Sequence, residues 1–436
     1  MTFLYWILKQ TAPRTGEVYF GDIILENEEA IPEGEPFIFV ANHPSSLLDP
    51  IVCGGYIKVP IHFLGRADLF KKKAVAKFLR SAHMWPIYRS IDGKDSLAKN
   101  EQVFKECYAS LKDGNPILLY GEGFTDERFI RRVKKIKKGA ARIAMGAESA
   151  YDFNLDLKIV PVGINYTNPE NLGGDLLIRF AEPISVQEYK EAYEVNNVKT
   201  YLEITNELER RIKSQAIHIE EIDYAPSFEK LIQLEEDTMH YTSREGASAL
   251  TTRWEKTKQL ADKVNSLATD EKESLFDKVN AFWKEVNAEG SELYIVRALK
   301  DKSISGVFDL LLLLIGFPIA LIGLIINLPL FILLKTLPQK LTPRITFYGG
   351  MKVAFGTFLT PILLSLMYGI ISLFIYVPYL YPVILIGGII TGIFAVKYLE
   401  TYRRFKRKLN AKKRLQALNL EELKVKYQEL IHFINE

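Results

Sequence analysis

The sequence has few cysteines and almost no net charge, and each shortage excludes a class of protein. Cys53 and Cys107 are the only cysteines in 436 residues, and their spacing matches no metal site. We therefore expect a reduced compartment, with one structural disulfide left open. The 56 basic residues exceed the 53 acidic ones by only three, and no RNA-type aromatic motif is present. Both observations argue against a nucleic-acid partner.

The N-terminal residues do not predict a secretory leader. The first ten residues, MTFLYWILKQ, have neither a basic start nor a long enough apolar run. This predicts that the water-soluble part of the chain stays in the cytoplasm. Residues 1–16 are expected to form a short interfacial helix, because aromatic and basic side chains suit the headgroup layer. The alternative is a frayed terminus packed on the following domain.

Charge is missing from two stretches near the C-terminus. No charged residue occurs in 310–334 or in 353–396, which are 25 and 44 residues long. About 20 apolar residues are enough to cross a bilayer core. The longer stretch contains a turn-like segment, YVPYLYP, and predicts a two-span hairpin over 353–396. Glycine and proline interrupt the shorter one, so residues 307–334 are expected to form either a re-entrant hairpin or a single span.

The basic residues that flank these stretches help to choose. Clusters follow each stretch, and the positive-inside rule places both on the cytoplasmic side. That requirement favours a re-entrant element followed by a two-span hairpin. The sequence thus predicts an integral membrane protein, in the inner membrane if the source is bacterial. Its regions are expected to be an α/β domain over 17–185, a helical segment over 186–304, a membrane domain over 305–400 and a basic helix over 401–436.

Residues 17–185 alternate short apolar runs with amphipathic stretches. The runs at 37–40, 116–120 and 159–162 predict buried strands. Helices are expected at 72–82, 97–112 and 138–148. This alternation predicts an α/β fold, a sheet with flanking helices. In such sheets ligands gather beyond the carboxyl ends of the strands.

One candidate for chemistry follows the first of these strands. Asn42 and His43 precede Asp49, and a histidine with a nearby carboxylate is the minimal apparatus of a general base. On an ideal helix the two side chains would lie about 120° apart, so the pair requires a turn through residues 44–46. Taken alone, a His and an Asp in one loop are more often structural.

Three more segments and one charge run stand out. The segments are Pro86-Ile87-Tyr88-Arg89, Tyr120-Gly121-Glu122-Gly123 and Val160-Pro161-Val162, and each alone has an ordinary structural explanation. Seven of the eleven residues in 128–138 are basic and none is acidic. Such a run is usually a solvated face, but beside membrane segments it is also a candidate for binding anionic headgroups or a phosphorylated substrate.

The four segments, in this order, resemble the blocks of the glycerolipid acyltransferase family, over about residues 35–185. Family members transfer an acyl chain from a thioester to a hydroxyl of a glycerol phosphate. The resemblance implies that His43 is the general base and that Asp49 orients it. It places Arg89, Glu122 and Gly123 at the acceptor phosphate and Pro161 beside the donor, and it makes Asn42 a further substrate-binding residue. It implies no metal or cofactor; the partners would be acyl-CoA or acyl-carrier protein, the acceptor, and membrane lipid.

Two departures from the family pattern bear on the acceptor. Five residues separate His43 from Asp49, whereas four is commonest, and the longer loop is similar to a bacterial branch and to yeast-type glycerol-3-phosphate acyltransferases. The third block lacks its usual arginine, for which Arg128 or Lys138 is a candidate replacement. We therefore expect glycerol 3-phosphate or dihydroxyacetone phosphate as acceptor. Lysophosphatidate or another lyso-lipid is the alternative, and a non-catalytic lipid-binding scaffold is the alternative of another class.

Overall fold

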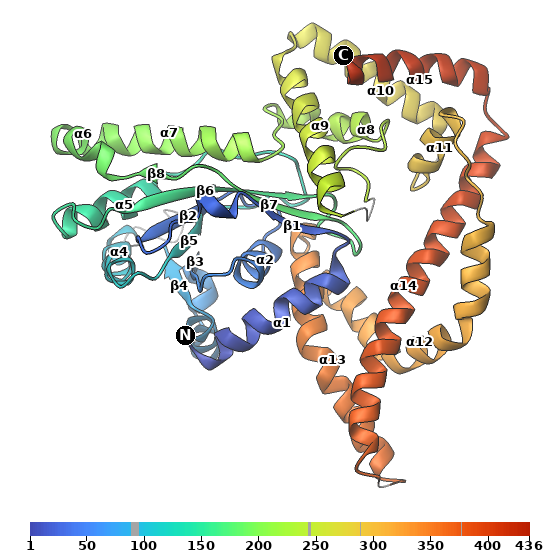
Figure 1. Ribbon diagram of the computed structural model, residues 1–436, viewed down its shortest axis with the longest axis horizontal. Helices are drawn as coiled ribbons and strands as arrows, with labels where there is room; N and C mark the ends of the chain where they lie inside the picture. Colours follow the sequence, from blue (N-terminus) through green and yellow to red (C-terminus); the bar gives the residue numbers. More distant parts are fainter. Residues whose placement is uncertain (89–95, 243–245, 288, 376) are drawn as a thin grey trace. The chain divides into compact units, whose positions relative to one another are not determined.

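The computed structural model describes residues 1–88, 96–242, 246–287, 289–375 and 377–436. The chain divides into two compact units (Figure 1). The first unit contains residues 1–218 and, from much later in the chain, residues 344–350. The second unit contains most of 219–436, including the apolar stretches.

The described part of the first unit contains one mixed sheet in the order β1-β7-β6-β2-β5-β3-β4, with β8 paired to β6. β2 pairs in parallel with β5 and β6, and β3 pairs in parallel with β4 and β5, whereas β7 runs antiparallel to β6. The carboxyl ends of β2, β5 and β6 therefore meet at one edge. The strands are β1 (Ile23–Glu26), β2 (Phe37–Ala41), β3 (His62–Arg66), β4 (Met84–Ile87), β5 (Ile117–Tyr120), β6 (Lys158–Tyr166), β7 (Leu176–Phe180) and β8 (Ile184–Ser185).

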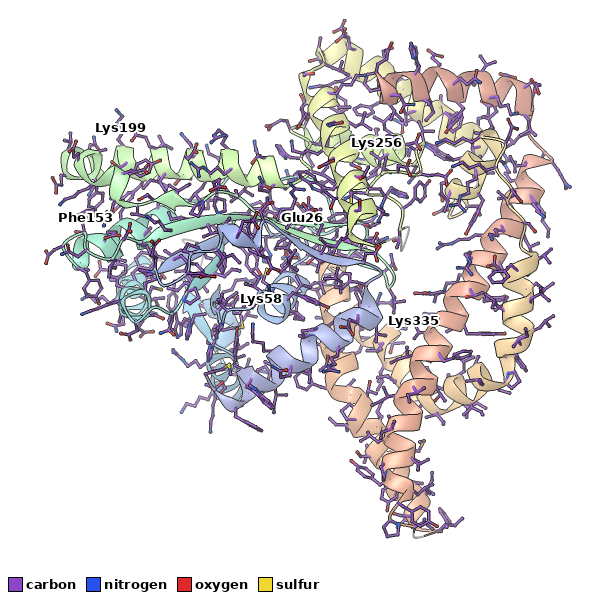
Figure 2. The ribbon with its side chains drawn as sticks, in the orientation of Figure 1. Glu26, Lys58, Phe153, Lys199, Lys256 and Lys335 are labelled. Carbon is purple, nitrogen blue, oxygen red and sulfur yellow. The ribbon has the colours of Figure 1, made fainter. Side chains whose placement is uncertain are left out.

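Helices cover both faces of this sheet, which is why β2 is buried along its whole length. Ile38 and Val40 pack with α4 (Ser96–Lys112), α5 (Gly139–Ala150) and α7 (Asn197–Gln215) in one apolar core. Phe39 points to the opposite face, where its ring meets Phe180. Figure 1 shows α7 along one face of the sheet, and α1 (Phe3–Tyr19) and α2 (Leu48–Tyr56) along the other. Polar side chains such as Lys199 point outward (Figure 2).

The expected α/β fold is confirmed, with its three predicted strands and with helices close to the predicted bounds. α3 (Lys73–Ser81) and α6 (Lys190–Val195) complete the helices of this part. Within the segment that the sequence predicts to be helical, α8 (Ala225–Ile232) is short. The Thr238 hydroxyl turns back and bonds the carbonyls of Ile232 and Glu235, which satisfies acceptors that a longer helix would have used.

The N-terminal helix and the two cysteines bear on earlier expectations. α1 packs on α2, buries Tyr5 against the His83 ring, and exposes Phe3 and Trp6. Whether this exposed side lies in a headgroup layer remains a prediction.

Cys53 and Cys107 are both free and buried, so the disulfide that the sequence left open is not formed. Burial raises the pKa of the Cys107 thiol to about 12, which keeps it protonated.

The second unit is helical throughout its described residues. α9 (Ala247–Ser266), α10 (Thr269–Val286) and α11 (Glu292–Leu299) precede the membrane helices, and the C-terminal α15 (Leu420–Asn435) packs against α10 and α11. Within this bundle the Tyr427 hydroxyl donates to the Leu234 carbonyl at 3.0 Å. The ends of the chain segment 219–436 are therefore folded together.

Among the described residues, three helices are long and apolar enough to cross a membrane, which indicates membrane association. They are α12 (Val307–Leu341), α13 (Tyr348–Ser372) and α14 (Leu380–Leu415). α12 and α14 lie side by side, and the Asn327 amide donates to the Gly388 carbonyl at 3.0 Å between them. α12 is one uninterrupted helix over the segment where a re-entrant hairpin or a single span was expected, and Figure 1 shows it bent rather than straight. The number of crossings remains a prediction.

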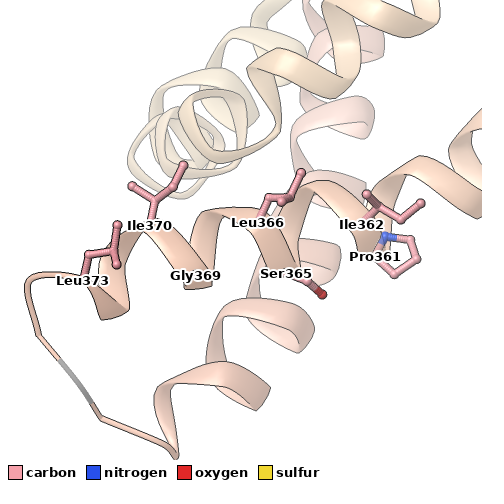
Figure 3. A pocket seen from close by; sticks show the side chains of 7 residues that line it. All are labelled: Pro361, Ile362, Ser365, Leu366, Gly369, Ile370 and Leu373. Carbon is pink, nitrogen blue, oxygen red and sulfur yellow. The ribbon is translucent and has the colours of Figure 1, made fainter.

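A shallow apolar groove of about 570 Å³ runs along α13 between Pro361 and Leu373 (Figure 3). Its floor is formed where Pro361, Ser365 and Gly369 recur at every fourth residue and leave little side chain. Exposed Leu366 and Ile370 border it. This surface suits hydrocarbon rather than water.

Candidate active site

The loop after β2 brings His43 and Asp49 together. His43 leaves the carboxyl end of the strand, and Asp49 is the second residue of α2. The intervening turn places His43 Nδ1 2.7 Å from Asp49 Oδ2, as the sequence predicted. Asp49 is fully buried, while the His43 side chain keeps 18% of its surface exposed. The ring is thus held from the protein side and open to a ligand.

Three donors converge on the Asp49 carboxylate. Besides His43, the Ser45 backbone N–H donates to Oδ2 at 2.9 Å, and the Tyr166 hydroxyl donates to Oδ1 at 2.8 Å. Hydrogen bonds to an ionised acceptor are about twice as strong as neutral ones, so they fix this carboxylate firmly. When His43 donates its Nδ1 proton to Asp49, Nε2 is left with a lone pair, as a general base requires.

Asn42 ties this loop to β6. Its amide Nδ2 donates to the Ile164 carbonyl at 3.0 Å, and the Ile164 N–H donates to Asn42 Oδ1 at 2.7 Å. The side chain therefore continues the strand pairing one step beyond the end of β2. This contact gives Asn42 a structural role; the substrate contact implied by the family resemblance is still a prediction.

The His43 ring rests on Tyr120, the last residue of β5. The two rings are stacked with centroids 4.0 Å apart and planes 9° apart. Burial, with Cys53 and Asp49 nearby, raises the pKa of Tyr120 well above its ordinary value. The phenol is therefore neutral and serves as a flat support for the imidazole.

The glutamate of the third block has an internal partner. Glu122 is fully buried, and its Oε2 lies 2.6 Å from Lys134 Nζ while its Oε1 accepts the Lys134 backbone N–H at 3.2 Å. Lys134 Nζ also lies 3.2 Å from Asp126. Burial raises the pKa of Glu122, and Lys134 opposes that rise. The placement of Glu122 at the acceptor phosphate, implied by the family resemblance, remains a prediction, and its observed contact is with a cation of its own domain.

The other predicted residues are more dispersed. Gly123 follows in a left-handed conformation (φ 77°), and Arg128 and Lys138 are exposed. Pro161 is buried inside β6 opposite Val40. Arg89 lies outside the described residues.

Part of the basic run is committed to the fold. Arg131 donates to the carbonyls of Tyr166 and Thr167, and Arg132 pairs with Asp126. The other members except Lys134 are exposed, and the sequence interpretation of the run as a solvated face or a candidate for binding anions stays a prediction for them. Sequence reasoning also missed Tyr166; the apolar alternation that continues past Val162 was the available signal. The described residues contain no group of three His, Cys, Asp or Glu side chains arranged for a metal ion.

Comparison with known proteins agrees with this geometry. Residues 22–165 match the model of the family described as Acyltransferase. Over 125 residues the chain is 26% identical to a 1-acyl-sn-glycerol-3-phosphate acyltransferase of Bacillus subtilis (strain 168), an alignment that spans 28% of this chain and 57% of the relative. Residues 22–165 are therefore similar to the Acyltransferase family, in agreement with the resemblance of this part of the chain to glycerolipid acyltransferases.

The similarity to known acyltransferases covers only part of the chain. The match falls within the first unit, so it does not extend to the membrane helices. A crystal structure of the 1-acyl-sn-glycerophosphate (LPA) acyltransferase PlsC from Thermotoga maritima is similar at 20% identity and a TM-score of 0.34, covering 47% of this chain and 78% of that one. The yeast-type branch suggested by the long His43–Asp49 loop remains a prediction.

Proposed function

We propose that this protein is a membrane-bound O-acyltransferase that moves a fatty acyl chain from a thioester to a glycerol-phosphate acceptor. The single observation that supports this most is the His43–Asp49 pair, buried on one side and open on the other, at the carboxyl edge of the sheet. The match of residues 22–165 to the Acyltransferase family model points to the same chemistry.

In this mechanism His43 Nε2 takes the proton of the acceptor hydroxyl as the oxygen attacks the thioester carbonyl. Asp49 stabilises the imidazolium that forms. The tetrahedral intermediate then collapses: the carbon–sulfur bond breaks, the new ester remains, and the thiolate leaves with the proton held by His43. We propose acyl-CoA or acyl-carrier protein as the donor and no metal or cofactor.

For the acceptor we place lysophosphatidate first, because the curated relative is named for that substrate class. Glycerol 3-phosphate, or dihydroxyacetone phosphate, is the second candidate, and the five-residue spacing between His43 and Asp49 favours it. We place the catalytic unit in the cytoplasm, in keeping with the basic residues that follow each apolar stretch.

The test is acyl transfer by the purified full-length protein in detergent. Labelled acyl-CoA is offered with lysophosphatidate, glycerol 3-phosphate and dihydroxyacetone phosphate in separate reactions. We expect product with one of them, and His43→Ala to lower kcat by about 1,000-fold or more, since base and orienter act as a unit. His432→Ala, which removes an exposed histidine on α15, serves as the matched control. Wild-type turnover in His43→Ala would refute the mechanism.

A further inference from the structure

The turn that folds Asp49 back onto His43 passes through a residue in an unfavourable backbone conformation. Ser46 has φ 40°, in the left-handed region that side chains other than glycine rarely adopt. It is buried, with 5% of its surface exposed. Because such residues persist only where the surroundings hold them, the contacts of Ser46 show what maintains the loop.

Its hydroxyl belongs to a chain of three. Ser46 Oγ lies 2.6 Å from Thr125 Oγ1 and 3.2 Å from Thr346 Oγ1. The Thr346 hydroxyl donates to the Asp126 carbonyl at 2.9 Å, and a carbonyl only accepts. Ser46 must therefore donate to Thr346, and Thr125 must donate to Ser46. Every hydroxyl in the chain gives one hydrogen bond and receives one, except Thr125, which gives one to Ser46.

Thr346 makes two further contacts through its backbone. Its carbonyl accepts from the Ser45 hydroxyl at 3.3 Å, and its N–H donates to the Glu127 carbonyl at 3.2 Å. The residue is fully buried. It therefore bridges the loop that contains His43 and the third block, although 300 residues separate it from Ser46.

The neighbours of Thr346 are fitted to the same surface. The Arg344 guanidinium donates to the Thr125 carbonyl at 2.8 Å. At Gly350 a Cβ would lie 2.6 Å from the Leu48 backbone nitrogen, so only glycine allows this approach. The segment 344–350 connects α12 to α13 and includes the first three residues of α13. The connection between two membrane helices thus forms part of the first unit, which contains His43 and Asp49.

We propose that Thr346 is a positioning residue for the His43–Asp49 loop, and that segment 344–350 completes the active site rather than only joining two membrane helices. The proposal rests on the acyltransferase function proposed above. By holding Ser46 in its left-handed conformation, Thr346 keeps Ser45 and Asp49 in the places from which they fix the imidazole. Its hydrogen bonds within the described residues run to the loop and to the third block, so it acts through Ser45 and Ser46.

The experiment measures kcat and KM of full-length variants on the acceptor that the wild type uses. Thr346→Val removes the hydroxyl at nearly constant volume, and Thr346→Ser restores it. Thr200→Val on α7 is the control, because Thr200 is equally buried and its hydroxyl bonds only the Asn196 carbonyl of its own helix turn. We expect Thr346→Val to lower kcat by about 10- to 100-fold with KM within about twofold of wild type, because misplacement of a catalytic group acts on the transition state. Thr346→Ser and Thr200→Val should keep kcat within about threefold, a change of under 1 kcal/mol in the barrier.

A double-mutant cycle tests the chain of hydroxyls. Ser46→Gly accepts the left-handed backbone but loses the Oγ. If Ser46 and Thr346 act through each other, the double variant Ser46→Gly/Thr346→Val loses less than the product of the two single losses. Independent, multiplicative losses would contradict the coupling.

The outcomes distinguish failure of the positioning role of Thr346 from failure of the proposed acyltransferase function. Wild-type kcat in Thr346→Val beside an inactive His43→Ala overturns the positioning role and leaves the proposed function standing. A loss in Thr346→Val that Thr346→Ser does not rescue, with a far larger fall in Tm than Thr200→Val shows, also overturns it and assigns Thr346 to folding. Full activity in His43→Ala refutes the function on which the proposal rests.

Discussion

Replacing Lys134 with methionine should strongly destabilise the first unit of the chain. Glu122 is fully buried, and the described residues give its carboxylate no other cationic partner within 4 Å. Removing one partner of a buried ion pair costs about 3–5 kcal/mol, because the other charge stays buried and uncompensated. At about 2–4 °C per kcal/mol for a unit of this size, Tm should fall by about 6–20 °C.

The loss of stability caused by Lys134→Met should be smaller at acidic pH. Burial raises the pKa of Glu122, and Lys134 is the main group that opposes the rise. Without Lys134 the folded variant holds a proton at a pH where the unfolded chain has released it. A carboxyl whose folded pKa is raised adds stability as pH falls through that pKa, so the Tm gap to wild type should narrow as the pH is lowered from neutrality.

Thermal unfolding of the detergent-purified protein, followed by intrinsic fluorescence, measures both effects. Lys135→Met removes an exposed lysine from the same run and is the matched control. Glu122→Gln should cost less than Lys134→Met, because Lys134 keeps Asp126 as a partner. The double variant should cost less than the sum of the two. A Tm for Lys134→Met within about 2 °C of the control, or a gap that widens in acid, would refute the reasoning, since about 1 kcal/mol produces a shift of that size.

Three further outcomes are expected. Tyr166→Phe removes one of three donors to Asp49 and should cost about 1.5–3 kcal/mol, measured as a lower Tm, with kcat reduced as well. Burial and a stacked neighbouring histidine lower the pKa of His83 to about 4, so stability should fall as pH drops from about 6.5 toward 4, and His83→Phe should remove that dependence of Tm. Cysteines introduced at Ser303 and Gln339, near the two ends of α12, should react with an impermeant thiol reagent from the same side of sealed vesicles. Labelling from opposite sides would contradict a re-entrant α12, whose two ends lie on one side of the membrane.

The sequence was informative where function depends on neighbouring residues. His43 and Asp49 are six apart, and the turn through proline and serine that the pattern predicted does bring them together. The strands next to the site were also predictable, because an apolar run after a turn has few alternatives in an α/β domain. The short strands β1, β3, β4, β7 and β8 were not identified, since their residues are held by pairing partners far away in the chain.

Contacts between distant segments could not be predicted in this way. Nothing in the spacing of Lys134 distinguishes it from Lys135, yet one is buried against Glu122 and the other is exposed. The same holds for Thr346, which occurs in an unremarkable stretch between two apolar helices. Burial that arises from tertiary packing leaves no local period in the sequence, so the charge run was taken as a surface.

The place of segment 344–350 also constrains the membrane helices. It is hydrogen-bonded into the first unit through Thr346 and Asp126. In keeping with the re-entrant element that the sequence predicts, we expect both ends of α12 to lie on one side of the bilayer, although its 35 residues, at about 1.5 Å each, would reach well beyond a core of about 30 Å. Three internal prolines, each lacking a helix N–H, permit the bend that such a return requires. Because α15 after α14 packs on α10 before α12, we expect α13 and α14 to form a two-span hairpin that returns to the same side, and the number of crossings stays a prediction.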